Sequence, residues 1–308
     1  MTTPNDSDDS PTKRPQFDEP HYEGYLSVSD GNLYYREFGS GDNVLVGLHG
    51  GPGAAHDYLA PLVELAGAEW TVYLYDQYGS GRSDTPPTGV YDHYTIEEYS
   101  DRLDEVREAI DSEQFHLYGQ SWGGWLALEH VLSYPGNVAS LTLADTSADI
   151  NRAAETMRNA ARSCLSDEEQ EEFEELVAAR TFGDDAFADY QERIKDEHIN
   201  RSDENPFEFG PATNADIYGV MWGPSEFVLA ETARLRDWSV TDRLGEIECP
   251  TLVINGEYDE IAPELGKEMA EQIPNARFVE FEGASHVPLW EVRKKHTETV
   301  QEFLKSVS

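Results

Sequence analysis

Short apolar runs alternate with amphipathic, helix-like segments along most of this 308-residue chain. The apolar runs are rich in β-branched and aromatic residues and are bounded by glycine and polar residues, which is typical of strands. Strands that alternate with helices form βαβ units, so the pattern predicts an α/β fold with a mainly parallel sheet flanked by helices. We expect strands at 24–28, 33–38, 44–48, 71–75, 115–118, 138–143, 251–254 and 277–281, and helices at 96–110, 122–133, 263–272 and 290–305.

The alternation stops between residues 146 and 242. This interval is helix-like, charged and poor in strand patterns, so we interpret residues 146–242 as a helical cap inserted between two strands of the sheet. The core that carries the sheet would then comprise residues 23–145 and 243–308. The first 20 residues contain four prolines and almost no apolar side chains, so we expect residues 1–22 to form a disordered or loosely packed tail.

The motif with the clearest chemical meaning is GQSWGG at residues 119–124. It follows the expected strand 115–118 and opens the expected helix 122–133, and a G-x-S-x-G pattern in that context is a nucleophile elbow. The tight turn would hold Ser121 in a strained backbone conformation with its hydroxyl exposed at the end of the sheet. The alternative is a glycine-rich turn with an idle serine.

A serine hydroxyl becomes a good nucleophile only when a base takes its proton and a carboxylate orients that base. Three of the four histidines that follow Ser121 are poorly placed for this task. His130 lies nine residues into the elbow helix, His198 lies in the cap, and His296 lies in a charged terminal helix. His286 instead follows the last expected strand in a loop, and we predict that it is the base.

The acid of such a triad is expected between the nucleophile and the histidine in chain order. Asp259 follows the strand 251–254 by a few residues, and open α/β sheets collect their active sites at the carboxyl ends of strands. We therefore predict that Asp259 is the acid. The alternative is Asp145, at the end of the strand 138–143, which could equally cap the first helix of the cap segment.

An oxyanion hole requires backbone N–H donors aimed at the attacked carbonyl oxygen. One donor is expected from the residue after the nucleophile, which is Trp122, and the other from the loop after the third strand. That loop is HGGPG at residues 49–53, and we choose Gly51 over Gly50. The loop lacks the lysine and the glycine spacing of a phosphate-binding loop.

The chain is strongly acidic, with 22 Lys and Arg against 61 Asp and Glu and a formal net charge of −39. Such a surface repels phosphate backbones and anionic lipids, so we expect neither nucleic acid nor membrane as a partner. No apolar stretch approaches the ~20 residues of a membrane helix and no secretory signal is visible, so we expect a cytoplasmic protein. Acids spread along the whole chain repel one another unless salt screens them, which favours a halophilic host with a salt-rich cytoplasm. The oligomeric state is not indicated.

Three motifs taken together, HGGPG at 49–53, YDQYGSGRSD at 75–84 and GQSWGG at 119–124, resemble those of the proline iminopeptidase family of α/β hydrolases. The resemblance extends from about residue 24 to the C-terminus, and the family includes the archaeal tricorn-interacting aminopeptidase. It implies an α/β-hydrolase fold with a helical cap, and removal of the N-terminal residue, often proline, from short peptides with a free N-terminus. It implies no metal and no cofactor, and it suggests a functional link to an upstream protease.

The same resemblance suggests which residues recognise the free amine of a peptide. Glu226, in GPSEF at 223–227, and Glu260 match the two glutamates that bind the amine in the family, and Tyr218 corresponds to a nearby tyrosine. Carboxylates recognise an ammonium group by charge-assisted hydrogen bonds. In a chain with 61 acids, either glutamate could instead be an ordinary solvated carboxylate.

Two other functions remain open. One keeps the chemistry and changes the substrate, which makes the protein an esterase, a lactonase or an amino-acid amidase, because a fold does not fix function. The other is a non-catalytic, hydrolase-like binding protein. It is disfavoured because nucleophile, base, acid and oxyanion loop all have candidates in the expected order.

Overall fold

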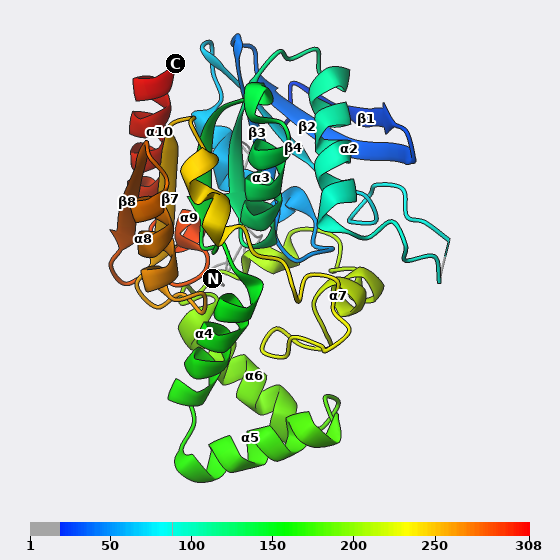
Figure 1. Cartoon of the computed structure of the whole chain (residues 1–308), viewed down its shortest axis with the longest axis vertical. Coiled ribbons are helices and arrows are strands. Elements are labelled where there is room, and N and C mark those ends of the chain that lie inside the picture. The colour runs from blue at the N-terminus through cyan, green and yellow to red at the C-terminus, as the bar shows by residue number, and fades with distance from the viewer. Residues whose placement is uncertain (1–18, 88) are drawn as a thin grey trace, which may run out of the picture.

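The computed structural model describes residues 19–87 and 89–308, so most of the predicted tail lies outside the described residues. Eight strands form one sheet in the order β1-β2-β4-β3-β5-β6-β7-β8 (Figure 1). The hairpin of β1 and β2 and the pair of β2 and β4 are antiparallel, and the remaining neighbours are parallel. The strands are β1 (Tyr22–Val28), β2 (Gly31–Gly39), β3 (Asn43–Leu48), β4 (Trp70–Tyr75), β5 (Phe115–Gln120), β6 (Val138–Ala144), β7 (Thr251–Gly256) and β8 (Ala276–Phe281). The mainly parallel α/β fold and all eight predicted strands are therefore confirmed.

Helices cover both faces of the sheet. The helices α2 (Ile96–Ala109), α3 (Trp122–Ser133) and α8 (Pro263–Gln272) share one apolar cluster with Val46 of β3. The 3-10 segment η1 (His56–Leu65) and the helices α9 (Pro288–Glu291) and α10 (Arg293–Val307) share another with Leu45. Neighbouring residues of β3 thus enter opposite layers, as the period of two along a strand requires.

The prediction of one continuous helix at residues 290–305 is wrong in one respect. The structure divides this region into α9 and α10, because Val292 leaves the helical conformation with φ −125° and ψ 39°. Pro288 opens α9 at a position where its missing N–H costs no helical hydrogen bond. Residues 290–305 contain neither glycine nor proline, so the sequence alone suggests one helix.

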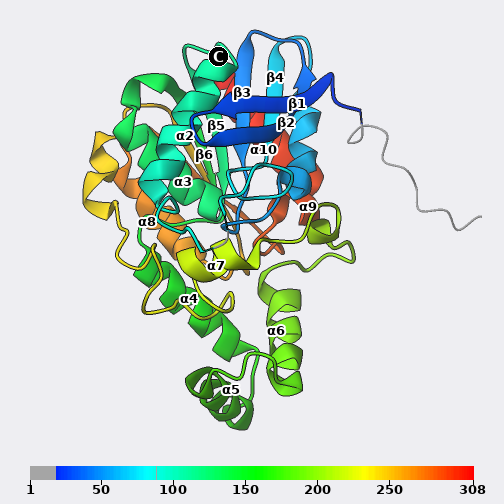
Figure 2. The same cartoon turned by 90° about the vertical axis from the view of Figure 1, so that its right-hand side faces the viewer.

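Between β6 and β7 the chain leaves the sheet and forms helices that project beyond the carboxyl ends of the parallel strands (Figure 1 and Figure 2). They are α4 (Ile150–Ser163), α5 (Asp167–Ala179), α6 (Asp185–His198), η3 (Pro206–Glu208) and α7 (Ala215–Met221). The segment η2 (Pro135–Asn137) precedes β6, and η4 (Thr241–Glu246) begins at the predicted end of the cap and leads to β7. The excursion begins and ends at one point, where the N–H of Ile150 donates to the carbonyl of Trp238 at 3.2 Å. We therefore propose that residues 146–242 form the cap.

None of the helices within 19–87 and 89–308 has the length and apolar character needed to cross a bilayer.

Candidate active site

Ser121 occupies a sharp turn between β5 and α3. Its backbone angles are φ 56° and ψ −122°, a conformation that non-glycine residues rarely adopt. The turn closes because the residues two positions away from Ser121 are glycines, since a Cβ on Gly123 would lie 2.0 Å from the carbonyl oxygen of Leu48. The N–H of Ser121 donates to the carbonyl of Ala144 at 2.9 Å. The sequence motif therefore builds the strained strand–turn–helix expected of a nucleophile elbow.

His286 and Asp259 form a buried pair. The ring nitrogen Nδ1 of His286 lies 2.6 Å from Oδ1 of Asp259, and that carboxylate also accepts from Nδ2 of Asn255 at 2.8 Å and from the N–H of Ile261 at 3.0 Å. With its proton on Nδ1, His286 keeps Nε2 free to accept one. Burial acts to lower the pKa of His286, but the charge and hydrogen bond of Asp259 outweigh it and raise the pKa above its ordinary value.

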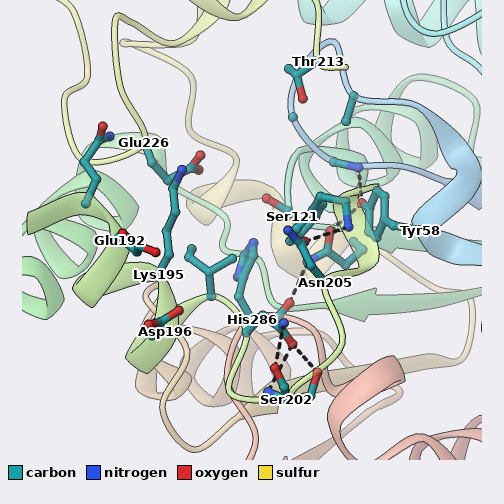
Figure 3. Close-up of a pocket in the computed structure, with 18 of the residues that line it drawn as sticks. Tyr58, Ser121, Glu192, Lys195, Asp196, Ser202, Asn205, Thr213, Glu226 and His286 are labelled. Atoms are coloured by element: carbon teal, nitrogen blue, oxygen red, sulfur yellow. Dashed lines mark hydrogen bonds between the residues drawn. The ribbon is translucent and has the colours of Figure 1, made fainter. Parts of the chain in front are cut away.

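A cavity of about 630 Å³ brings the predicted nucleophile and base together. Ser121 and His286 both line it, and their side chains extend into the same space (Figure 3). Gly51, Tyr218 and Glu226 line it as well. Asp259 and Glu260 lie behind this lining and are 5% and 1% exposed.

The other histidines after Ser121 have different environments. Nδ1 of His130 donates to the carbonyl of Ser100 at 3.1 Å, and Nε2 of His296 lies 2.8 Å from the hydroxyl of Tyr118. Burial lowers the pKa of both imidazoles, to about 4 and about 3. His198 contacts a backbone carbonyl outside the cavity. The geometry therefore favours His286 as the base.

Asp145, the alternative acid, is buried beside Asp259 rather than beside the histidine. Its Oδ1 accepts from the N–H of Gly256 at 3.1 Å. Burial and then the negative charge of Asp259 raise the pKa of Asp145 well above its ordinary value. The ring of His286 contacts Asp259 at 2.6 Å, whereas Asp145 accepts from the backbone of Gly256, so the geometry favours Asp259 as the acid.

Two glycines of the loop after β3, Gly50 and Gly51, line the cavity. The N–H of Gly50 donates to the hydroxyl of Tyr58, so it is already engaged. Gly51 lines the cavity with φ +113°, which only glycine adopts without strain. Trp122 is the first residue of α3, where an N–H has no partner within the helix. These observations favour the N–H groups of Gly51 and Trp122 as the oxyanion donors.

Sequence reasoning gave no role to two buried glutamines that hold the catalytic loops. Gln77 donates from Nε2 to the carbonyl of His49 at 2.9 Å and accepts from the indole of Trp122 at 2.7 Å. Gln120 donates to the carbonyl of His286 at 2.8 Å and accepts from the hydroxyl of Tyr58 at 2.6 Å. The sequence indicated a role for these glutamines only through their positions inside the motifs 75–84 and 119–124.

Carboxyl groups gather on the side of the cavity that faces the cap. The hydroxyl of Tyr218 donates to Oε2 of Glu226 at 2.8 Å. Oε1 of Glu260 lies 4.0 Å from Nε2 of His286, and within the described chain neither oxygen of this carboxyl has a hydrogen-bond donor. Burial, then the charges of Glu226 and Asp259, raise the pKa of Glu260, while the ammonium of Lys195 opposes this. Figure 3 places Lys195 and Glu226 across the cavity from Tyr58.

Comparisons with known proteins identify the family and the fold. Residues 43–292 match the family model described as the alpha/beta hydrolase fold. The proline iminopeptidase of Saccharolobus solfataricus is 32% identical over 299 residues, which cover 92% of this chain and 93% of that protein. The proline iminopeptidase of Heyndrickxia coagulans is 31% identical over 292 residues, which cover 92% of this chain and 99% of that protein.

Two solved structures have the same architecture. The crystal structure of the proline iminopeptidase of Mycobacterium smegmatis superposes with a TM-score of 0.82 at 29% identity and covers 92% of this chain and 98% of that one. The crystal structure of VinJ superposes with a TM-score of 0.86 at 30% identity and covers 94% of this chain and 100% of that one. The chain therefore belongs to the proline iminopeptidase family of α/β hydrolases.

Proposed function

We propose that this protein is a serine aminopeptidase that hydrolyses the bond after the N-terminal residue, proline or another apolar residue, of short peptides. The observation that carries the proposal is a single cavity in which the strained Ser121 and the ring of His286 lie beside Glu226. Activity of the proline iminopeptidase type agrees with the curated relatives.

The chemistry follows from the positions of these groups. Ser121 Oγ attacks the first peptide carbonyl while Nε2 of His286 takes its proton, and Asp259 stabilises the imidazolium. The N–H groups of Gly51 and Trp122 receive the negative charge that develops on the carbonyl oxygen. His286 then protonates the leaving amine. Water, activated by the same imidazole, releases the amino acid from the acyl-enzyme.

The free amine of the substrate would bind between Glu226 and Glu260. A buried carboxyl without a hydrogen-bond donor is costly, and an ammonium group would supply both the charge and the donors that Glu260 lacks. Tyr218 holds the carboxylate of Glu226 in place. Although Asp259 and Glu260 are adjacent, one contacts Nδ1 of His286 and the other lies near Nε2. One imidazole therefore lies between the triad acid and the amine site.

Substitution of Glu226 tests the amine site. We expect Glu226→Gln to lower kcat/KM by about 10²-fold for a prolyl amide with a free amine, because the ammonium group would lose a partly buried ionic partner. An N-acetylated ester should be hydrolysed at nearly the wild-type rate, since it carries no charge at this position. The comparison requires steady-state kinetics with both substrates.

Glu192→Gln is the matched control, because Glu192 lines the same cavity but has no role in the proposed amine site. It should leave both substrates nearly unaffected. Equal losses for the free and blocked substrates in Glu226→Gln would contradict amine recognition and would favour an esterase, a lactonase or an amidase.

We also propose a cytoplasmic location in a salt-rich host and a place downstream of a protease that supplies short peptides. The salt-rich host is inferred from the excess of negative charge, because the chain has 61 Asp and Glu but only 22 Lys and Arg. At molar salt the Debye length falls to ~3 Å, so repulsion between exposed carboxylates is largely removed.

We expect the urea midpoint of unfolding to rise between low and molar KCl. Sorbitol of equal osmolality is the control, and equal stability at the two salt concentrations would contradict the proposal.

A further inference from the structure

The turn that ends α6, residues 198–202, connects the cap to the loop of the triad acid. Nδ1 of His198 donates to the carbonyl of Tyr258 at 2.7 Å, and its Nε2 lies 3.1 Å from the hydroxyl of Ser163. The guanidinium group of Arg201 lies 4.1 Å from the centre of the Tyr258 ring. Tyr258 directly precedes Asp259. Two side chains of the cap therefore hold the residue before the acid.

The same turn contacts the loop of the base through Glu291. The N–H of Arg201 donates to Oε1 of Glu291 at 2.7 Å. That carboxylate also accepts from the N–H of Ser285 at 2.7 Å and from its hydroxyl at 2.6 Å. Ser285 directly precedes His286. One carboxylate thus joins the cap to the residue before the base.

The turn is also part of the substrate cavity. Ile199, Asn200 and Ser202 line the cavity together with Ser121 and His286, and Figure 3 shows Ser202 and His286 at one side of it. A peptide in the cavity would therefore touch the segment that holds both triad loops.

We propose that the 198–202 turn and Glu291 form a brace that positions Asp259 and His286 relative to each other, with His198 and Glu291 as positioning residues. This inference rests on the proposed function. The 2.6 Å contact between Asp259 and His286 joins the loops after β7 and β8, which the N–H of Tyr258 also joins by donating to the carbonyl of Ala284 at 2.9 Å, and the brace adds contacts from the cap to both loops. A misplacement of about 1 Å in such a site can cost about 10²-fold in rate. In this proposal the cap contributes to the chemistry as well as to substrate binding.

His198 provides the first test. We expect His198→Ala to lower kcat about 10-fold with KM unchanged, because the loop before Asp259 loses its hydrogen bond while the cavity lining stays intact. His198→Asn is the matched variant, since its amide can donate from nearly the position of Nδ1, and it should restore most of the rate. Phosphonylation of Ser121 by a fluorophosphonate should follow kcat, because this reaction needs the triad and no free amine.

Glu291 provides the second test through the pH profile. The ring of His286 faces Asp259, Glu260 and Glu226, and the charge of Glu291 adds to theirs in raising the pKa of His286. Activity requires neutral His286, so activity rises as the pH passes its pKa. Glu291→Gln should therefore lower kcat and also move the acid limb of kcat/KM to lower pH. Glu268→Gln is the control, because Glu268 lies on the exposed surface of α8, where it pairs with Arg152. This substitution should change neither kcat nor the acid limb of kcat/KM.

The brace is wrong if His198→Ala and Glu291→Gln fold normally and retain wild-type kcat and phosphonylation rates. It is also wrong if His198→Asn is as slow as His198→Ala. Failure of the proposed function would give a different result. The wild-type protein would then show no preference for substrates with a free amine. The phosphonylation rates of the variants would still test the brace, because phosphonylation needs no free amine.

Discussion

Ser121→Ala should lower kcat for a prolyl amide by about 10⁶-fold, the loss found when a triad serine is removed. Ser121 lines the cavity and is the hydroxyl residue that the elbow holds at φ 56°. The residual rate should reflect the oxyanion donors and substrate binding alone. Steady-state hydrolysis at high enzyme concentration measures the loss.

Ser133→Ala is the control for this substitution. Ser133 ends α3, the helix that Ser121 precedes, and its side chain contacts Glu129 on the exposed surface. It should leave kcat unchanged. Wild-type turnover by Ser121→Ala would show that Ser121 has no catalytic role. It would favour a non-catalytic binding protein, with the turnover due to a contaminating enzyme.

Asp259→Asn should lower kcat by about 10⁴-fold while the fold is retained. The carboxylate accepts the Nδ1 proton of His286 at 2.6 Å, and an amide in its place would favour the wrong tautomer or fail to stabilise the imidazolium. The effect should appear in kcat rather than in KM, because Asp259 does not line the cavity. Kinetics at several pH values distinguish this loss of kcat from a shift in the pKa of His286.

Asp145→Asn is the informative comparison, because Asp145 is the competing acid. Burial and the charge of Asp259 favour its neutral form, and an amide resembles a neutral carboxyl in shape. We expect the loss in kcat to stay within about 10-fold, the scale of one neutral hydrogen bond. A larger loss in Asp145→Asn than in Asp259→Asn would transfer the role of acid to Asp145.

Local patterns predicted the sheet because each strand carries its own apolar run between turn residues. They also indicated Ser121 and His286, since a nucleophile elbow and a loop after a strand can be recognised from neighbouring residues. The roles of these side chains and of Asp259, Gly51 and Trp122 stay predictions, for which the structure supplies a consistent geometry.

Other features depend on contacts between distant segments, which a single sequence does not reveal. The N–H of Gly50 is engaged by Tyr58, which supports Gly51, but only the folded chain shows this contact. The brace joins His198 to Tyr258 and Arg201 to Glu291 across 60 and 90 positions of sequence. The break at Val292 likewise lies within residues 290–305, which contain no glycine or proline to mark it.

One labelling experiment tests the nucleophile and the amine site together. Peptide mass mapping after treatment of the wild-type protein with a fluorophosphonate should find one label, on Ser121. Prolinamide, which carries a free amine, should slow the labelling, whereas N-acetylprolinamide should have little effect. A label on another residue, no label at all, or equal protection by the two amides would contradict a serine aminopeptidase built around Ser121, His286 and Glu226.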